Sequence, residues 1–460
     1  MKTNALLACF CCLLISAGLA AQPLDSAWRN KMEIIQKTSA ADHQQMLSQL
    51  GITGLRPGPS GDPKAPNAAN SDESRATAYD HLPDPLQFVN GARVTNQHQW
   101  QSRRKELIQL FDKEIYGVMP DNTPAVNWRI IKSTDSVIGG LPVIVQEITG
   151  HVDNSRCPRI DVNIEMTLVL PQKSAHPVPV IIHYGFRLPP GMQFPEQPSG
   201  EPALDWKEQC IRAGYGFIVL IPASYQADNG AGLRSGIIGL MNKGDYRKPG
   251  DWGTLRAWAW GASRVLDYLE KYPAVAADKV AIEGLSRYGK AALVTMAYDR
   301  RFSAGFIGSS GAGGGKILRR QFGEQVENLC SAAEYHWFAG NFIRYAGPLT
   351  PADLPVDAHE LVALAAPRPI FIGVGNPAVE GNWIDAKGLY LAAVYASPVY
   401  DILHARGLVT PSRENLPPLG TLLDDGDIAF RQHFGGHTNL PNWSAFLVFV
   451  NKYWEKSKHQ

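Results

Sequence analysis

The chain has 460 residues, of which 45% are hydrophobic, and its 44 Lys and Arg residues nearly balance 43 Asp and Glu residues. That length is ample for one large α/β domain with insertions. A net charge of +1 without a basic stripe argues against a nucleic-acid-binding protein.

The first 21 residues have the pattern of a secretory signal peptide. Lys2 gives a short positive region, residues 5–15 form an apolar core, and small residues at 18–21 suit cleavage. The core is too short to span a bilayer as a mature helix, so a permanent membrane anchor is the weaker alternative. We expect a secreted or periplasmic protein that has no membrane attachment once residues 1–21 are removed.

Three cysteines lie outside that segment: Cys157, Cys210 and Cys330. An odd number at wide spacing does not make a disulfide framework, although one bridge is possible. Among these three there is no CxxC pair and no cysteine with a nearby histidine, and the chain has no HExxH motif. The fold must therefore rest on its hydrophobic core, and we expect no metal and no other cofactor.

Residues 22–80 differ in composition from the rest of the chain. A helical pattern covers residues 28–50, and residues 56–80 are rich in Pro, Asn, Ser and Ala, which predicts a linker or an extended wrap over the surface. The main domain is predicted to span residues 81–460.

Within this domain, β-rich and helical patterns succeed one another. Residues 100–116 have helical periodicity, and residues 126–149 and 160–170 have the patterns of antiparallel edge strands. Strands then alternate with helices, which predicts a doubly wound parallel sheet with its site at the carboxyl ends of the strands. The strands are expected at 178–183, 216–221, 280–282, 302–307 and 369–373, and the helices at 208–213, 254–269 and 446–453.

Residues 284–290, Gly-Leu-Ser-Arg-Tyr-Gly-Lys, connect an apolar run at 279–282 to a helical run. A strand, a sharp turn with Ser286 at its apex and a helix together form a nucleophile elbow, with an ordinary turn as the alternative. The usual second glycine position is occupied by Tyr288, and Gly289 follows it. The pattern predicts an exposed serine hydroxyl near a helix N-terminus, which favours developing negative charge.

Such a serine needs a histidine base and an orienting acid, in the chain order serine, acid, histidine. His437 is the favoured base because its loop, Phe-Gly-Gly-His-Thr-Asn, directly precedes the last helix, while His359 is interpreted as a support for a loop. The downstream histidines considered are His336, His359, His404, His433 and His437.

The acid is expected just after the strand that ends near Gly375. The following loop offers Glu380 and Asp385. Glu380 is favoured because it is nearer the strand end, while Asp385 leads into a helix and could instead be its N-cap.

Two cations follow the nucleophile. Arg287 places a guanidinium beside it, and its backbone N–H belongs to the expected oxyanion hole together with a donor from the loop after His183. Lys290 lies one helical turn beyond Ser286 and can project into the same pocket, with a solvated helix surface as the alternative.

Further motifs accompany the elbow, and together they are far more specific than the elbow alone. They are Trp-Ala-Trp-Gly at 258–261, a glycine-rich segment at 310–314, Asp-x-His-Glu at 357–360, Ala-Pro-Arg-Pro at 366–369 and Arg-Gln-His-x-Gly-Gly-His-Thr at 431–438. With these motifs the chain, from about residue 82 to residue 453, resembles the glucuronoyl esterases and their bacterial relatives.

The resemblance implies an α/β-hydrolase fold, a three-layer sandwich with a mostly parallel central sheet and helices on both faces. It implies a carboxylic ester hydrolase that cleaves esters between 4-O-methyl-glucuronoyl groups of xylan and lignin alcohols. Glucuronoxylan or a lignin–carbohydrate ester is then the expected partner, and the protein is expected to act as a monomer.

The resemblance also assigns residues. It makes Ser286 the nucleophile, His437 the base and Arg287 a stabiliser of the oxyanion. Some members place the acid two or three residues before a tryptophan at the uronate, which fits Glu380 and Trp383. Sugar hydroxyls would be bound by Lys290 and Glu334, with Glu327 as a second and weaker candidate.

One position departs from the family. Many members carry an acid after the sixth strand, where this chain has Ser309, which cannot orient an imidazole as an anion. Three alternatives to this interpretation are kept: another esterase of the same fold such as an acetyl xylan esterase, a non-catalytic carbohydrate-binding relative, and, more weakly, a peptidase.

Overall fold

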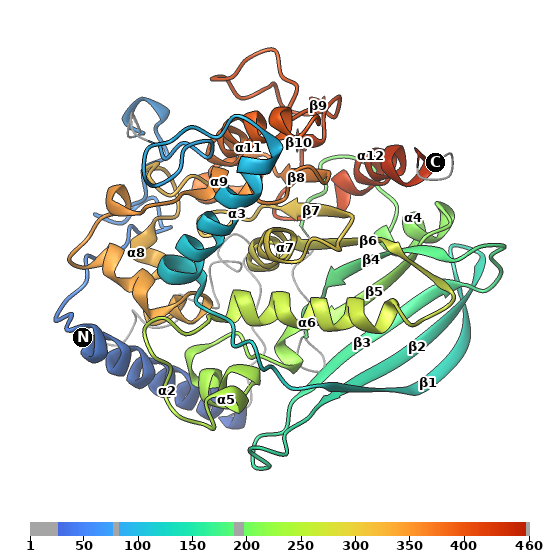
Figure 1. Ribbon diagram of the computed structural model, residues 1–460, viewed down its shortest axis with the longest axis horizontal. Coiled ribbons are helices and arrows are strands. Elements are labelled where there is room, and N and C mark those ends of the chain that lie inside the picture. The colour runs from blue at the N-terminus through green and yellow to red at the C-terminus, as the bar shows by residue number, and fades with distance from the viewer. Residues whose placement is uncertain (1–25, 77–81, 188–196, 457–460) are drawn as a thin grey trace.

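The computed structural model describes residues 26–76, 82–187 and 197–456, so the expected signal peptide lies outside the described residues. A ten-stranded sheet crosses the molecule in the order β1-β2-β3-β5-β4-β6-β7-β8-β10-β9 (Figure 1). The strands are β1 Val126–Ile138, β2 Leu141–Val152, β3 Asn163–Pro171, β4 Val178–Tyr184, β5 Gly216–Ile221, β6 Val275–Leu285, β7 Ala304–Gly308, β8 Ile370–Val374, β9 Leu422–Leu423 and β10 Ile428–Gln432. The α-helices are α2 Ser26–Leu50, α3 Gln97–Phe111, α4 Trp206–Arg212, α5 Ile237–Met241, α6 Thr254–Leu269, α7 Arg287–Tyr298, α8 Val326–Leu329, α9 Ala358–Ala363, α10 Pro377–Glu380, α11 Ala386–Ile402 and α12 Trp443–Lys456.

The centre of the sheet is parallel and its edges are antiparallel. Strands β5, β4, β6, β7, β8 and β10 pair in parallel, while β1, β2 and β3 form an antiparallel edge that joins β5. Burial on both faces explains why the central strands are continuous apolar runs. The parallel strands predicted from residue 178 onward and the antiparallel edge predicted before them are both confirmed.

Helices cover both faces of the sheet. Trp443, Phe446 and Phe449 of α12 pack with Cys210 and Ile211 of α4 against one face. Helices α6, α7 and α11 contribute to the larger core on the other face (Figure 1). This arrangement confirms the predicted α/β-hydrolase sandwich.

The Trp-Ala-Trp-Gly motif belongs to helix α6. Trp258 and Trp260 are buried, and a Cβ at Gly261 would lie 2.3 Å from ring atoms of Tyr225. Tyr225 in turn donates a hydrogen bond to the carbonyl oxygen of Trp258, at 3.0 Å. The motif therefore packs α6 onto the segment that follows β5.

Two elements differ from the sequence-based expectations. Strand β10 was not anticipated, because its five residues are short and lie between a turn and the histidine motif. The expected helix at 100–116 ends as α-helix at Phe111 and continues as a π-turn at Asp112–Tyr116.

The N-terminal segment packs on the rest of the protein. Helix α2 lies along two 3-10 turns, η4 (Gly230–Arg234) and η6 (Gly340–Ala346) (Figure 1). Farther along, Asn328 Nδ2 donates to the carbonyl oxygen of Pro59 (2.9 Å), and Gly323 N donates to that of Asn70 (2.9 Å). The segment from Pro59 to Asn70 thus runs over the surface beside residues 321–328.

Candidate active site

Ser286 is held at the apex of a strained turn between β6 and α7. Its φ of 62° and ψ of −127° lie outside the regions that non-glycine residues usually adopt. A Cβ at Gly284 would lie 2.2 Å from the carbonyl oxygen of Tyr288, and one at Gly289 would lie 2.4 Å from that of Gly308. Glycine is therefore required at 284, beneath the first turn of α7, and at 289, where α7 meets the end of β7.

His437 and Glu380 form a pair close to the carboxyl ends of β10 and β8. His437 Nδ1 lies 2.6 Å from Glu380 Oε1, and Gly375 N donates to Glu380 Oε2 at 2.6 Å. With the carboxylate bound at Nδ1, the imidazole presents Nε2 for proton transfer. Within the described residues no hydrogen bond joins Ser286 Oγ to this imidazole; such contacts are often long without substrate and tighten when it binds.

A buried carboxylate links the histidine loop to the elbow. Glu283, directly before Gly284, accepts a hydrogen bond from Asn439 Nδ2 through one oxygen and contacts His183 Nδ1 through the other. Asn439 also donates to the carbonyl oxygen of Gly284, at 3.3 Å. The loop that carries His437 is thereby fixed over the end of β6, a role for Glu283 that no sequence motif indicated.

Asp385, the second candidate acid, has a different environment. Both of its oxygens accept from Arg320 Nε, at 3.1 and 2.9 Å, and its Oδ1 accepts from Gly388 N at 3.0 Å. Asp385 is the N-cap of α11, the alternative that the sequence left open.

The other histidines are bonded elsewhere. His359 Nε2 contacts the carbonyl oxygen of Pro83 at 2.7 Å, and His433 Nδ1 accepts from Gly435 N at 3.0 Å. His336 contacts Asp228, and His404 lies in a left-handed turn with φ of 60°.

Two cations lie beside the elbow on helix α7. Arg287 Nη1 donates to Asp228 Oδ2 at 2.6 Å, and Lys290 Nζ donates to Glu324 Oε2 at 3.0 Å. Both cations stand over the ring of Trp337, at 5.2 and 5.5 Å from its centroid. Sequence reasoning placed the two cations here, but it missed Asp228 and Glu324.

Comparisons with known proteins identify the family of this chain. A family model described as "Glucuronyl esterase, fungi" matches residues 243–404. The 4-O-methyl-glucuronoyl methylesterase 1 of Wolfiporia cocos is 26% identical over 80% of this chain and 85% of its own length. Carbohydrate esterase MZ0003, from an unknown prokaryotic organism, is 32% identical over 84% of this chain and 92% of its own length. This chain belongs to the glucuronoyl esterase family.

Solved structures of glucuronoyl esterases support the same conclusion. The CE15 glucuronoyl esterase from Teredinibacter turnerae T7901 is 44% identical, covers 90% of this chain and all of its own chain, and superposes with a TM-score of 0.84. The protein is thus a carboxylic ester hydrolase of this family. The family, the fold and the enzyme class expected from the motifs are confirmed.

Glu334 lies near the two cations of helix α7. Among the described residues no group donates a hydrogen bond to its Oε2, although that atom is buried. Burial and the neighbouring Glu324 carboxylate raise the pKa of Glu334 to about 8, against the opposing effect of Lys290 and Arg287. A buried carboxyl group with a free oxygen is suited to a polar ligand.

The raised pKa predicts a pH-dependent gain in stability for Glu334→Gln. Between the ordinary pKa of 4.5 and about 8, the folded protein holds a proton that the unfolded chain releases, so wild-type stability falls as pH rises. We expect the variant to melt about 1–3 °C higher than wild type at pH 8 and equally at pH 5, by differential scanning calorimetry. Glu327→Gln is the matched control, and an equal gain there would contradict the prediction.

Glu327 and Trp383 are placed differently from Glu334. Glu327 Oε1 accepts from Arg56 Nε at 3.1 Å, so the carboxylate is paired with the N-terminal segment. Trp383, half-buried in the turn η8 (Asn382–Ile384), accepts a hydrogen bond at its carbonyl oxygen from Glu324 N, at 2.9 Å. Trp383 is therefore linked through Glu324 to Lys290, whereas Glu327 is paired with Arg56.

Ser309 occupies the position where many family members carry an acid. It is buried, with φ of 39°, and its backbone N–H donates to the carbonyl oxygen of Gly373 at 2.8 Å. In the described part of the chain no group pairs with its hydroxyl. The carboxylate on His437 comes instead from Glu380, in the short helix α10 that follows the neighbouring strand β8.

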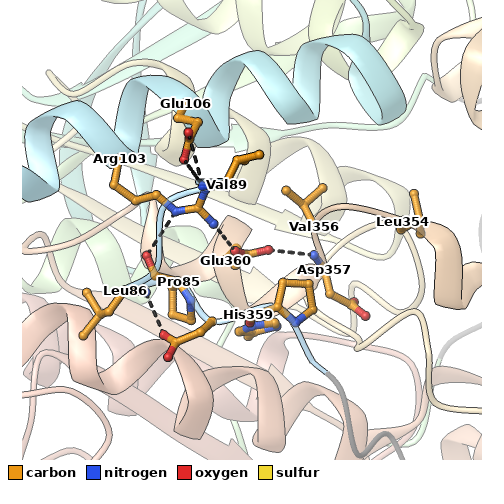
Figure 2. A network of polar contacts seen from close by, with 12 residues as sticks. Pro85, Leu86, Val89, Arg103, Glu106, Leu354, Val356, Asp357, His359 and Glu360 are labelled. Carbon is orange, nitrogen blue, oxygen red and sulfur yellow. Dashed lines mark hydrogen bonds and ion pairs between the residues drawn. The ribbon is translucent and has the colours of Figure 1, made fainter. Parts of the chain in front are cut away.

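The Asp-x-His-Glu motif belongs to a network of polar contacts that includes Arg103 of helix α3 (Figure 2). Glu360 Oε1 accepts from Arg103 Nη2 at 2.9 Å, and its other oxygen accepts from the backbone N–H of Asp357 at 3.1 Å. Asp357 then accepts from Leu318 N at 2.7 Å and from Arg319 Nη1 at 3.0 Å. The network thus fixes the chain between the glycine-rich segment and Glu324.

Two further findings concern the described residues alone. They contain no group of three or more His, Cys, Asp and Glu side chains that could hold a metal ion, and Cys157, Cys210 and Cys330 are free and buried. None of their helices has both the length and the apolar character needed to cross a membrane.

Proposed function

We propose that this protein hydrolyses esters of 4-O-methyl-glucuronic acid, such as those between glucuronoxylan and lignin alcohols. Ser286, His437 and Glu380 form its catalytic triad. The observation that carries the proposal is the 2.6 Å contact between His437 Nδ1 and Glu380 Oε1. The loop that contains His437 is also bonded to the elbow, through the hydrogen bond from Asn439 to Glu283. The relatives named as glucuronoyl esterases support the substrate class.

The reaction is an acyl transfer in two steps. His437 Nε2 takes the proton of Ser286 as Oγ attacks the uronoyl carbonyl, and the negative charge that develops on the carbonyl oxygen is stabilised by Arg287 and by backbone N–H groups. The carbon–oxygen bond to the alcohol breaks, and the alcohol leaves with the proton from His437. Water then attacks the acyl-enzyme, again through His437, and releases the uronate and the free serine.

The sugar is recognised on the side of the two cations. Lys290 and Glu334 bind its hydroxyls, and Trp383 contacts the uronate ring. This assignment is supported by Glu334 Oε2, a buried atom without a hydrogen-bond partner among the described residues, and by the proximity of Lys290 to Trp337. Glu327 is left out of the set because its carboxylate is occupied by Arg56.

The test is hydrolysis of benzyl glucuronate by the purified mature protein, beside acetylated xylan, with Ser286→Ala as the blank. Release of benzyl alcohol without release of acetate is the expected result. Release of acetate alone would instead identify an acetyl xylan esterase. Release of neither, with Ser286 inert to a fluorophosphonate, would identify a non-catalytic relative.

We also propose that the protein is exported as a monomer after its signal peptide is cleaved behind Ala20 or Ala21. The pattern of Lys2, the apolar core and the small residues at 18–21 supports export. N-terminal sequencing of the protein recovered outside the cytoplasm should begin at residue 21 or 22, and an intact N-terminus there would contradict the proposal.

A further inference from the structure

Asp228 lies outside every motif of the sequence, in the segment between β5 and η4, yet three side chains converge on its carboxylate. Oδ2 accepts from Arg287 Nη1 at 2.6 Å. Oδ1 accepts from Trp337 Nε1 at 2.7 Å and contacts His336 Nε2 at 3.1 Å. Burial lowers the pKa of His336, which favours a neutral ring, and a proton on Nε2 can then be donated to Asp228.

Two contacts hold the guanidinium of Arg287: Asp228 binds its edge, and the ring of Trp337 lies against its face. Asp228 holds one nitrogen, and the ring of Trp337 lies 5.2 Å from the guanidinium carbon. Among the described residues no group accepts a hydrogen bond from Arg287 Nε. The side chain is still 27% exposed, so a substrate can reach it.

The pair stays charged over the whole range in which an esterase is assayed. Burial alone would raise the pKa of Asp228, but Arg287 and His336 outweigh it and hold that pKa well below its usual range. For Arg287, burial is likewise outweighed by Asp228, which raises the pKa of the guanidinium. The ion pair is therefore a permanent part of the site.

Helix α2 supports both segments that carry this cluster. Ala231 N, three residues after Asp228, donates to Ser39 Oγ at 3.0 Å. Tyr335, directly before His336, donates through its hydroxyl to Asp42 Oδ1 at 2.5 Å. The N-terminal helix thus limits the movement of the carboxylate.

We propose that Asp228 is a positioning residue for Arg287, which it holds where negative charge develops on the carbonyl oxygen during ester hydrolysis. The inference rests on the proposed function of Arg287. A stabilising group displaced by about 1 Å can cost about 100-fold in rate, because its interaction strengthens only in the transition state. Asp228 acts on turnover through Arg287 and leaves binding of the ground-state sugar largely unchanged.

Asp228→Asn is the sharpest test. The amide oxygen can keep the hydrogen bonds from Trp337 and His336, while the amide NH₂ faces Arg287 and removes the ion pair. We expect kcat for benzyl glucuronate to fall about 100-fold and KM to change less than about threefold. Asp267→Asn, which removes a distant exposed partner of Arg301, is the matched control and should match wild type.

A double-mutant cycle separates positioning from general damage to the pocket. If Asp228 acts through Arg287, then Asp228→Asn has no further effect on kcat in an Arg287→Met background. An additional loss of more than about fivefold, or an unchanged kcat in Asp228→Asn alone, would overturn the proposal. If Asp228→Asn does not fold, Asp228→Glu keeps the charge but shifts the contact, and a wild-type kcat in that variant would also overturn it.

A second readout is independent of the natural substrate. A fluorophosphonate that reacts with Ser286 places its phosphoryl oxygen in the oxyanion site, so its rate of labelling reports on Arg287. Slower labelling in Asp228→Asn is expected even if benzyl glucuronate is not a substrate of the wild type. Equal labelling rates in wild type and Asp228→Asn would contradict the positioning role of Asp228. Failure to cleave benzyl glucuronate would contradict only the proposed substrate, so the two failures are distinguishable.

Discussion

Ser286→Ala is expected to lower kcat for benzyl glucuronate by about 10⁶-fold, because the acyl-enzyme can no longer form. The remaining groups, above all Arg287 and the backbone N–H donors, would still stabilise an oxyanion formed by direct attack of water. The measurement is the rate at which benzyl alcohol is released, quantified by chromatography, at substrate concentrations above and below KM.

Ser309→Ala is the matched control for this prediction. Ser309 is a buried serine at the end of the neighbouring strand and also has a positive φ, of 39°. Its hydroxyl has no place in the proposed reaction, so its loss should change kcat less than about threefold. A residual activity of Ser286→Ala above about 1% of wild type would mean that the ester is cleaved without this nucleophile.

The sheet and the elbow were predictable because their signals are local. Residues 178–183 and 216–221 are continuous apolar runs, as expected of parallel strands buried on both faces. The elbow needs glycine at fixed positions around Ser286, and the structure shows the close contacts that require Gly284 and Gly289. Such constraints act within a few residues, and the sequence therefore displays them.

The partners of the site residues were not predictable in the same way. Asp228, Glu283 and Glu324 reach Arg287, Asn439 and Lys290 from other parts of the chain. Nothing in the local pattern around an isolated acidic residue states which cation or amide the fold will bring to it. These contacts depend on the order of strands in the sheet and on the path of each loop.

The same reasoning explains the placement of Glu327. On sequence, Glu327 and Glu334 are both acidic residues in one segment after β7, and both were candidates for binding a sugar. The fold brings Arg56 to Glu327 from 271 positions earlier in the chain, whereas Oε2 of Glu334, near Lys290, has no hydrogen-bond partner in the described part of the chain. A long-range contact thus distinguishes two residues that the sequence alone could only rank.

Glu380→Ala is expected to lower kcat by about 10⁴-fold, whereas Asp385→Ala should cost well under 100-fold. Without the Glu380 carboxylate at Nδ1, His437 loses its orientation and the group that stabilises the imidazolium. Asp385 bonds Arg320 and caps α11, so its loss should appear mainly as a lower melting temperature. The measurement is kcat for each variant, with its melting temperature to establish that the enzyme is folded.

Glu380→Gln refines this test, because it preserves the volume of the side chain and can still accept from Gly375 N. The amide either donates to Nδ1, which selects the wrong tautomer, or accepts without supplying charge, so kcat should stay close to that of Glu380→Ala. A greater loss in Asp385→Ala than in Glu380→Ala would transfer the role of the acid to Asp385. That result would also require the segment from Trp383 to α11 to rearrange, since Asp385 is now bound to Arg320 through both oxygens.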